Sequence, residues 1–375
     1  MTIQSTDAKT KELVELTSNL IKFQSTKDNY AQIKDCLNYI KKYFSGTRVI
    51  IKEFEFNKKS SLVISFQDKT SFSLLLNGHI DVIEAEPEQY VPKVDGDKLY
   101  GRGAIDMKGG VAAFLLLMKE LSSQQSLQKT LPDIALMIVS DEELGGFNGT
   151  GPLSKKYTAN FVIASEPTHS NSPSQINIIK AEKGVLWLKL KASGKACHAS
   201  RPWLGDNALV ALMNAYTKLK KMFPDTTSKN RWKHTINVGK IIGGDSPNRV
   251  PDYAEMLIDI RFMEATNSKK LLGKIKKELP KNVILEVIED SPMLINTEFM
   301  LIKKLQYSVA KSTGKKVELL QEHGASDLRF YSEQGTPSVI FGPLGAGYHG
   351  KEEFIYISSL TLYYTALKNF VNENY

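Results

Sequence analysis

Cysteine is scarce in this chain of 375 residues, which contains only Cys36 and Cys197. The two lie far apart and form no Cys-x-x-Cys pair, so the sequence excludes both a disulfide scaffold and a thiolate zinc site. Such sparing use of cysteine is typical of a reducing compartment, and we therefore expect a cytoplasmic protein.

The sequence also lacks a long hydrophobic run. Its longest apolar helical pattern covers residues 111–118, which is too short to span a bilayer. The first residues, MTIQSTDAKTKEL, are polar and lack the apolar centre of a signal peptide. We therefore expect no membrane partner.

Clusters of one charge sign are absent as well. The formal net charge is +8 at pH 7, but most basic residues are lysines placed singly among glutamate and aspartate. This pattern is typical of a solvated surface, and we expect no nucleic-acid partner. No low-complexity tract interrupts the chain, and its length favours two globular domains.

Four apolar runs, each with the pattern of a buried strand, end in a histidine or a carboxylate. A lone acidic pair after a strand is usually a solvated turn, but four coincident strand ends predict one polar site. In an open α/β sheet such a site lies at the carboxyl edge of the strands. We expect the first of these strands to end at an Asn77-Gly78 turn. The ends carry, in chain order, His79 and Asp81 after residues 72–76, Glu142 and Glu143 after 133–139, Glu166 after 161–164, and His349 after 338–341.

A glycine-rich stretch adds a further carboxylate. Residues 100–110 read YGRGAIDMKGG and precede an expected helix at 111–121. The glycine and lysine spacing fits neither a phosphate-binding loop nor a dinucleotide fingerprint. The small residues instead allow Asp106 to approach the sheet edge closely.

Histidine and carboxylate groups without thiolates predict a metal centre. Such ligands suit Zn²⁺, Co²⁺ or Mn²⁺, and five of them are too many for one catalytic ion with an open position. We therefore expect two Zn²⁺ per subunit, or Co²⁺ or Mn²⁺, with Asp106 as the natural bridge. Asp81 is placed to accept a hydrogen bond from the ring nitrogen of His79 that the metal does not use. Glu142, redundant as a ligand, is placed to act as a general base.

Residues 183–292 have a different character. Their periodicity predicts strands at 185–193, 235–242, 253–262 and 283–288 and helices at 207–223 and 268–278, in the order of a ferredoxin-like unit. We therefore expect an α/β protein with a mixed central sheet sandwiched by helices, formed by residues 1–182 and 293–375. The inserted α+β domain would serve as a lid, and its one-sided strands leave an edge or face for pairing in a homodimer.

Smaller elements complete the expected catalytic domain. Amphipathic patterns predict helices at residues 6–23 and 30–44, followed by short strands at 48–56 and 61–66. Residues 82–99 are rich in proline and charge, and we expect a loop there.

Five stretches resemble a known enzyme family in their order and spacing. They are GHIDV at 78–82, GRGAIDMKGG at 101–110, SDEELGG at 140–146, SEP at 165–167 and the late His349. They look like the co-catalytic zinc family of acetylornithine deacetylase, succinyl-diaminopimelate desuccinylase, aminoacylase, carboxypeptidase G and cytosolic dipeptidases. The resemblance implies that His79 and Glu166 hold one ion, Glu143 and His349 the other, and Asp106 both. It also implies a cis peptide bond after Asp106, an orienting role for Asp81, and Glu142 as the base.

The resemblance extends to the inserted segment. His198, in KACHASRP at 195–202, resembles the histidine that reaches across the dimer to stabilise the tetrahedral oxyanion. Asn248 and Arg261 resemble residues that bind the substrate carboxylate or carbonyl oxygen, and arginine has a suitable two-pronged geometry. A salt-bridged strand residue is the alternative for Arg261.

The substrate is less clearly marked by the sequence. Residues 324–330, GASDLRF, are similar to a desuccinylase stretch and make Ser326 a candidate substrate contact. Ala325 and Gly345, however, stand where that enzyme carries polar groups, so strict diaminopimelate specificity does not follow.

Together these patterns and the family resemblance imply a di-zinc amidohydrolase. We expect it to cleave the amide bond of an N-acyl amino acid with metal-activated water, in the manner of a deacetylase or desuccinylase. A carboxypeptidase or dipeptidase that acts on short peptides is the alternative. A non-catalytic metal-dependent binding protein on the same scaffold is disfavoured, because it would not need Glu142 as a base.

Overall fold

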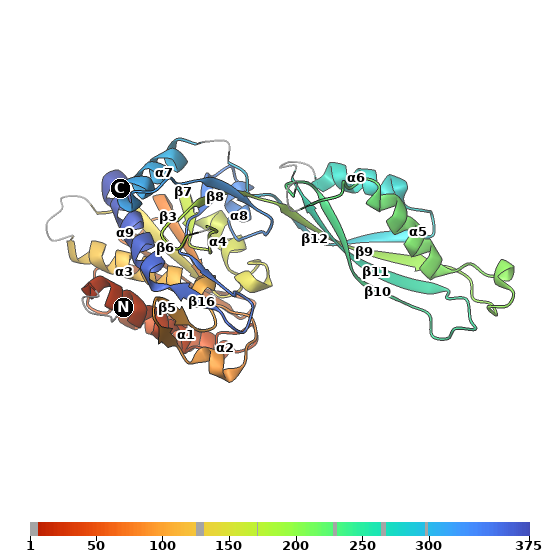
Figure 1. Cartoon of the computed structure of the whole chain (residues 1–375), viewed down its shortest axis with the longest axis horizontal. Helices are drawn as coiled ribbons and strands as arrows, with labels where there is room; N and C mark the ends of the chain where they lie inside the picture. The colour runs from red at the N-terminus through yellow and green to blue at the C-terminus, as the bar shows by residue number, and fades with distance from the viewer. Residues whose placement is uncertain (1–6, 125–130, 171, 228–230, 264–267, 297–298) are drawn as a thin grey trace. The chain divides into compact units, whose positions relative to one another are not determined.

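The computed structural model describes residues 7–124, 131–170, 172–227, 231–263, 268–296 and 299–375. The chain divides into two compact units (Figure 1). The first unit consists of Met1–Ala181, Ile295–Gln321 and Ser326–Tyr375, and the second of Glu182–Leu294 and Glu322–Ala325. No helix in the described ranges is long and apolar enough to cross a bilayer.

An eight-stranded mixed sheet forms the centre of the first unit. Its four middle strands, in the spatial order β6-β3-β7-β14, run parallel, whereas β1, β2 and β8 pair antiparallel. The full order is β1 (Ile50–Phe56), β2 (Lys59–Ser65), β6 (Ile134–Val139), β3 (Ser71–His79), β7 (Thr158–Ala164), β14 (Ser338–Ile340), β8 (Ile178–Glu182) and β13 (Leu319–Glu322).

The prediction that β3 ends at an Asn77-Gly78 turn is wrong. The strand continues to His79, and Asn77 and Gly78 pair with Met137 and Ile138 of β6. Asn77 is buried, and its side-chain amide donates a hydrogen bond to the hydroxyl of Thr150 at 3.2 Å. This tertiary partner allows a typical turn residue to remain in a central strand.

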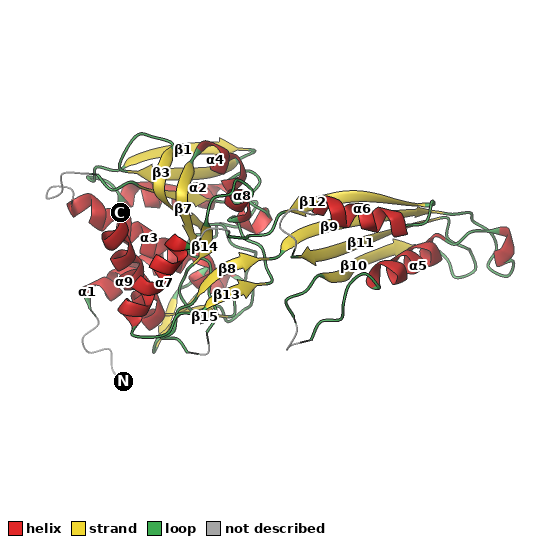
Figure 2. Cartoon of the chain, turned by 90° about the horizontal axis from the view of Figure 1, so that it is seen from above, coloured by secondary structure: helices red, strands yellow, loops and turns green. Residues whose placement is uncertain are grey.

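Helices cover both faces of this sheet (Figure 2). One face buries Leu74 and Leu76 in a single hydrophobic core with the helices α1 (Ala8–Ile21), α2 (Tyr30–Tyr43), α3 (Gly109–Gln124), α7 (Met300–Thr313) and α9 (Ile357–Asn374). The opposite face carries Met137, whose sulfur accepts the hydroxyl of Tyr331, and the helices α4 (Thr150–Lys156) and α8 (Arg329–Ser332). The predicted mixed sheet between helices is confirmed.

A second, smaller sheet replaces part of the loop expected at 82–99. That segment contains the 3-10 turn η1 (Pro87–Tyr90), the strand β4 (Lys93–Asp95) and the start of β5 (Lys98–Tyr100). The sheet has the order β15 (Gly345–Ala346), β16 (Phe354–Tyr356), β5 and β4, all antiparallel. The partner of β5 lies some 250 residues later in the chain, so no local sequence pattern predicts this sheet.

In the residues that the structure describes, the second unit is an antiparallel four-stranded sheet with two α-helices. Its spatial order is β10 (Thr235–Gly243), β11 (Tyr253–Phe262), β9 (Gly184–Ser193) and β12 (Val283–Ser291). Alternate residues of β11 are buried with α5 (Ala208–Lys220) and α6 (Ser268–Glu278), which confirms the predicted ferredoxin-like arrangement. At its base, the backbone N–H of Glu182 donates to the carbonyl of Leu294 at 3.0 Å, so the two ends of the insertion lie side by side.

A charged cluster ties three helices of the first unit together. Glu120 of α3 pairs with Lys9 of α1 and with Lys368 of α9, the latter at 2.6 Å, and it accepts the hydroxyl of Tyr364. Burial acts to raise the pKa of Glu120, but these hydrogen bonds outweigh it and lower the pKa from 4.5 to about 2. The ionised carboxylate is therefore favoured by folding.

We expect Glu120→Gln to lower the free energy of unfolding at pH 7 by about 1–2 kcal/mol, after allowance for the partly exposed lysines. Because the folded-state pKa is depressed, this contribution is present above pH 4.5 and disappears as the pH falls toward 2. Urea denaturation between pH 3 and pH 7 measures it, with the exposed Glu15→Gln as the control. A pH-independent difference between wild type and Glu120→Gln would contradict the assignment.

Candidate metal centre

The parallel strands bring the polar residues to one edge of the large sheet. His79 at the end of β3 is level with Val139 of β6, and Asn77 is level with Ala164 of β7. The chain leaves β6 into the turn η3 (Glu142–Leu144), and it leaves β7 into Ser165 and Glu166. Side chains that follow these strands therefore meet at their carboxyl ends, as the sequence predicted.

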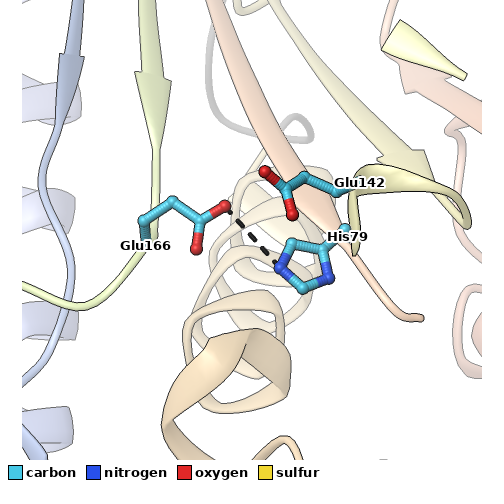
Figure 3. A group of neighbouring side chains, drawn as sticks. All are labelled: His79, Glu142 and Glu166. Atoms are coloured by element: carbon cyan, nitrogen blue, oxygen red, sulfur yellow. Dashed lines mark ion pairs between the residues drawn. The ribbon is translucent and has the colours of Figure 1, made fainter. Parts of the chain in front are cut away.

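One group consists of His79, Glu142 and Glu166. Each offers a ligand atom, and these atoms all lie within 4.8 Å of one another. Nε2 of His79 lies 3.6 Å from Oε1 of Glu166, and Figure 3 shows both carboxylates directed toward the space beside the buried imidazole.

A second group consists of Asp106, Glu143 and His349, again with ligand atoms within 4.8 Å. Nε2 of His349 lies 3.1 Å from Oε1 of Glu143 and 3.4 Å from Oδ2 of Asp106. The other oxygen of Asp106, Oδ1, lies 3.2 Å from Nε2 of His79. Asp106 thus joins the two groups through its two oxygens.

The backbone of Asp81 orients the ring of His79. Nδ1 of His79 lies 2.9 Å from the carbonyl oxygen of Asp81 and 3.6 Å from its carboxylate. A carbonyl only accepts, so Nδ1 carries the proton and Nε2 is directed toward Asp106 and Glu166. The Asp81 carboxylate instead accepts the backbone N–H of Glu143 at 3.0 Å, so it holds the turn that carries Glu143.

The electrostatics reflect carboxylates gathered around two imidazoles. Burial acts to lower the pKa of His79, but Glu166 and Asp106 raise it well above its ordinary value. Hydrogen bonds to Asp106 and Glu143 raise the pKa of His349 to about 10. Burial and the neighbouring Glu166 raise the pKa of Glu142 well above the ordinary range. The surrounding carboxylates thus favour positive charge at this edge of the sheet.

These residues fit divalent cations. In each group an imidazole Nε2 faces carboxylate oxygens at 3.1–3.6 Å, with no thiolate nearby in the described residues. Nitrogen and oxygen donors of this kind suit Zn²⁺, Co²⁺ and Mn²⁺. An ion at each group would supply positive charge among these carboxylates.

The glycine-rich stretch places Asp106 in an irregular turn, η2 (Ala104–Lys108), before α3. The peptide bond between Asp106 and Met107 is cis, as the resemblance implied. At the start of α3, a Cβ on Gly110 would lie 1.8 Å from Oγ of Ser165. Only glycine therefore allows α3 to approach the segment that precedes Glu166 so closely.

Three predicted residues lie in the second unit. They are His198, Asn248 and Arg261. His198 and Asn248 are both exposed and lie on neighbouring segments. His198 forms an isolated antiparallel β-bridge with Arg249, and the backbone N–H of Ala199 donates to the carbonyl of Asn248 at 2.9 Å. Nδ1 of His198 lies 2.8 Å from the hydroxyl of Ser200.

Arg261 of the second unit and Ser326 of the first both have partners within their own unit. Arg261 of β11 donates through Nε and Nη2 to the carboxylate of Asp259 at 2.9 Å, which is the salt-bridged alternative considered for it. Ser326 is buried in the first unit, and its carbonyl accepts Nη1 of Arg329 at 2.9 Å.

Two residues beside the centre escaped the sequence analysis. Arg102 and Glu353 are buried and form an ion pair at 2.6 Å next to the Asp106 turn. Arg102 lies within the quoted glycine-rich motif and Glu353 four residues after His349. The closeness of these charged residues to candidate ligands in the sequence could have indicated that they lie beside the site.

Sequence comparison identifies relatives of this chain. A probable succinyl-diaminopimelate desuccinylase of Staphylococcus aureus strain MRSA252 is 30% identical over 261 residues, which cover 66% of this chain and 61% of that protein. The chain thus spans less than two thirds of that relative's length.

Solved structures share the fold over nearly the whole chain. An aminopeptidase PepT from Bacillus cereus superposes with a TM-score of 0.78 at 18% identity, covering 97% of this chain and 98% of that one. A tripeptidase from Staphylococcus aureus Mu50 gives 0.77 at 22% identity, with the same coverage. The sequence pattern of Peptidase family M20/M25/M40 matches residues 75–373, and the chain belongs to this family.

Proposed function

We propose that this protein is a two-metal hydrolase that cleaves the amide bond of an N-acyl amino acid, as a deacetylase or desuccinylase does. The observation that carries the proposal is the pair of histidine–carboxylate groups joined by the two oxygens of Asp106. In this proposal the first unit is catalytic, and the second is a lid and dimerisation domain.

The metal ligands in this proposal are five residues of the first unit. His79 and Glu166 would hold one ion, Glu143 and His349 the other, and Asp106 both. Two divalent cations here would supply Lewis-acid polarisation of the scissile carbonyl and a lowered pKa for the attacking water. Zn²⁺ is the proposed metal, with Co²⁺ or Mn²⁺ as alternatives.

Glu142 carries the proton in this mechanism. Its carboxylate lies in the group with His79 and Glu166 and points toward the space beside the imidazole (Figure 3). Burial and the neighbouring Glu166 raise its pKa, which favours a carboxyl group that can take up a proton. Glu142 accepts the proton of the attacking water and then delivers it to the departing amine nitrogen. Asp81 keeps the His79 ring and the Glu143 turn in place during these steps.

Substrate recognition is assigned to three polar residues in this proposal. Asn248 and Arg261 would bind the carboxylate or carbonyl oxygen of the substrate, and Ser326 would add a contact. Arg261 is already engaged with Asp259, so a substrate carboxylate would have to share its guanidinium.

A substrate panel tests the reaction. N-acetyl amino acids, N-succinyl amino acids and dipeptides are incubated with the chain after loading with Zn²⁺, Co²⁺ or Mn²⁺, and the released amine is measured. We expect release from the acylated amino acids. Cleavage of dipeptides alone would favour the carboxypeptidase or dipeptidase alternative, and no cleavage with any metal would contradict both.

We also propose a homodimer formed through the second unit. In the described sheet of this unit β10 is an edge strand, and Ile241 and Ile242 on it are 44% and 53% exposed. Met213 of α5 is 50% exposed as well. An edge with large exposed apolar side chains suits pairing with a second copy.

The dimer carries a prediction for His198, which we propose acts on the oxyanion of the partner subunit. We expect His198→Ala and Glu142→Gln to be nearly inactive separately, and mixed heterodimers to recover a measurable fraction of wild-type activity. Each heterodimer contains one site with both intact residues. Activity after co-refolding or subunit exchange measures the recovery, and none would argue against the cross-subunit contact.

A further inference from the structure

The carboxylate of Glu353 lies beneath the turn that carries Asp106. Glu353 is 2% exposed, and its Oε1 accepts the backbone N–H groups of Ile105 at 3.2 Å and of Asp106 at 3.3 Å. Its Oε2 accepts Nη1 of Arg102 at 2.6 Å. Both oxygens are therefore committed to the segment between Arg102 and Asp106.

The guanidinium of Arg102 reaches in the other direction, to the turn that carries His349. Nη2 of Arg102 donates to the carbonyl of Gly350 at 2.9 Å. The side-chain amide of Gln89 donates to the same carbonyl at 2.9 Å. Arg102 thus links Glu353 to the backbone one residue beyond His349.

The turn at His349 needs such support. His349 has a φ of +62°, in the left-handed region that disfavours residues other than glycine, so its conformation must be imposed by its surroundings. His349 itself is about half exposed, so side-chain packing alone does not hold it. The bonds that Arg102 and Gln89 donate to the carbonyl of Gly350 hold the backbone next to this residue.

We propose that Glu353 and Arg102 form a positioning pair that sets the separation of Asp106 and His349. This inference rests on the proposed function, because it matters for the reaction only if these two residues share an ion. The pair connects segments about 250 residues apart, next to the β5–β16 pairing of Tyr100 with Phe354. Buried ion pairs add little to the free energy of unfolding on their own. The hydrogen bonds of this pair go to the turns that carry Asp106 and His349, so its role is to hold these two candidate ligands in position.

The test measures metal binding rather than turnover. The chelated full-length chain is titrated with Co²⁺, and affinity and the visible absorption of the bound ion are recorded. We expect Glu353→Gln, which places an amide N–H against Arg102, to weaken Co²⁺ binding roughly 10–100-fold and to change the spectrum. Arg102→Lys keeps the charge but reaches only one of its two partners, and we expect a loss in the same range.

Glu352→Gln is the matched control, because it removes the same charge from the adjacent, exposed residue. We expect its Co²⁺ affinity to equal that of wild type. The double variant should lose less than the product of the single losses, because the two residues act through one contact.

Three outcomes separate the possibilities. Wild-type Co²⁺ affinity in Arg102→Lys and Glu353→Gln, with only a lower melting temperature, would overturn the positioning role. If Glu353→Gln fails to fold, Arg102→Lys decides the question alone. A wild-type chain that binds no Co²⁺ would contradict the proposed function itself.

Discussion

Replacing Glu142 by glutamine is expected to lower kcat roughly 10²–10⁴-fold, the range that general acid–base catalysis contributes. Glutamine keeps the shape of the side chain but neither accepts nor delivers a proton. Because Glu142 lies in a group with His79 and Glu166, the variant also separates two roles. If Glu142 is a base, its replacement leaves the metal content near that of wild type. If Glu142 is a metal ligand, its replacement lowers the metal content.

Steady-state kinetics and metal analysis of the same preparation measure both quantities. Glu88→Gln serves as the control, since Glu88 is exposed in η1 and belongs to neither metal-ligand group. Substantial retained activity in Glu142→Gln would remove Glu142 from the mechanism. Loss of bound metal in parallel with activity would instead make it a ligand.

Removal of metal is expected to abolish activity, and Asp106→Asn is expected to do nearly the same in the presence of metal. Asp106 is the residue whose two oxygens face both histidines, and hydrogen bonds to them hold its pKa well below the usual range against the effect of burial. Asparagine lacks the negative charge and offers a single acceptor oxygen, so it cannot present an oxygen to both histidine–carboxylate groups.

Thermal unfolding gives a second reading of the same prediction. An ion that binds only the folded chain stabilises it by about 2.7 kcal/mol when its concentration is 100 times Kd. We therefore expect Zn²⁺, Co²⁺ or Mn²⁺ to raise the melting temperature of the chelated wild type and to restore activity. Asp106→Asn should show little of either effect, while Asp95→Asn, at an exposed position in β4, should behave as wild type. Equal shifts in wild type and Asp106→Asn would contradict the bridging role.

The gathering of three of the site residues could be predicted because each lies at the end of a parallel strand or shortly after it. His79, Glu143 and Glu166 come directly after apolar runs, and parallel strands necessarily bring their ends to one edge. The hydrophobic alternation of β11 likewise predicts the one-sided sheet of the second unit.

What escaped prediction depends on contacts between distant segments. The strand β5 pairs with β16, and Glu353 binds the Asp106 turn, although the partners are about 250 residues apart. The course of β3 through Asn77 depends on Thr150 in another element. The hydrogen bond from His79 goes to the carbonyl of Asp81, which any residue type would offer, so the sequence pattern pointed to the carboxylate instead.

The backbone pairing of Glu182 with Leu294 bears on how the chain tolerates its insertion. The two ends of the inserted segment are hydrogen-bonded to each other as neighbouring strands are. For the rest of the chain, the insertion is therefore equivalent to a closed loop. The entropy of closing a loop grows only with the logarithm of its length, by about 0.6 kcal/mol for each doubling. The second unit can therefore lengthen, shorten or change its sequence at little entropic cost to the sheet that carries His79.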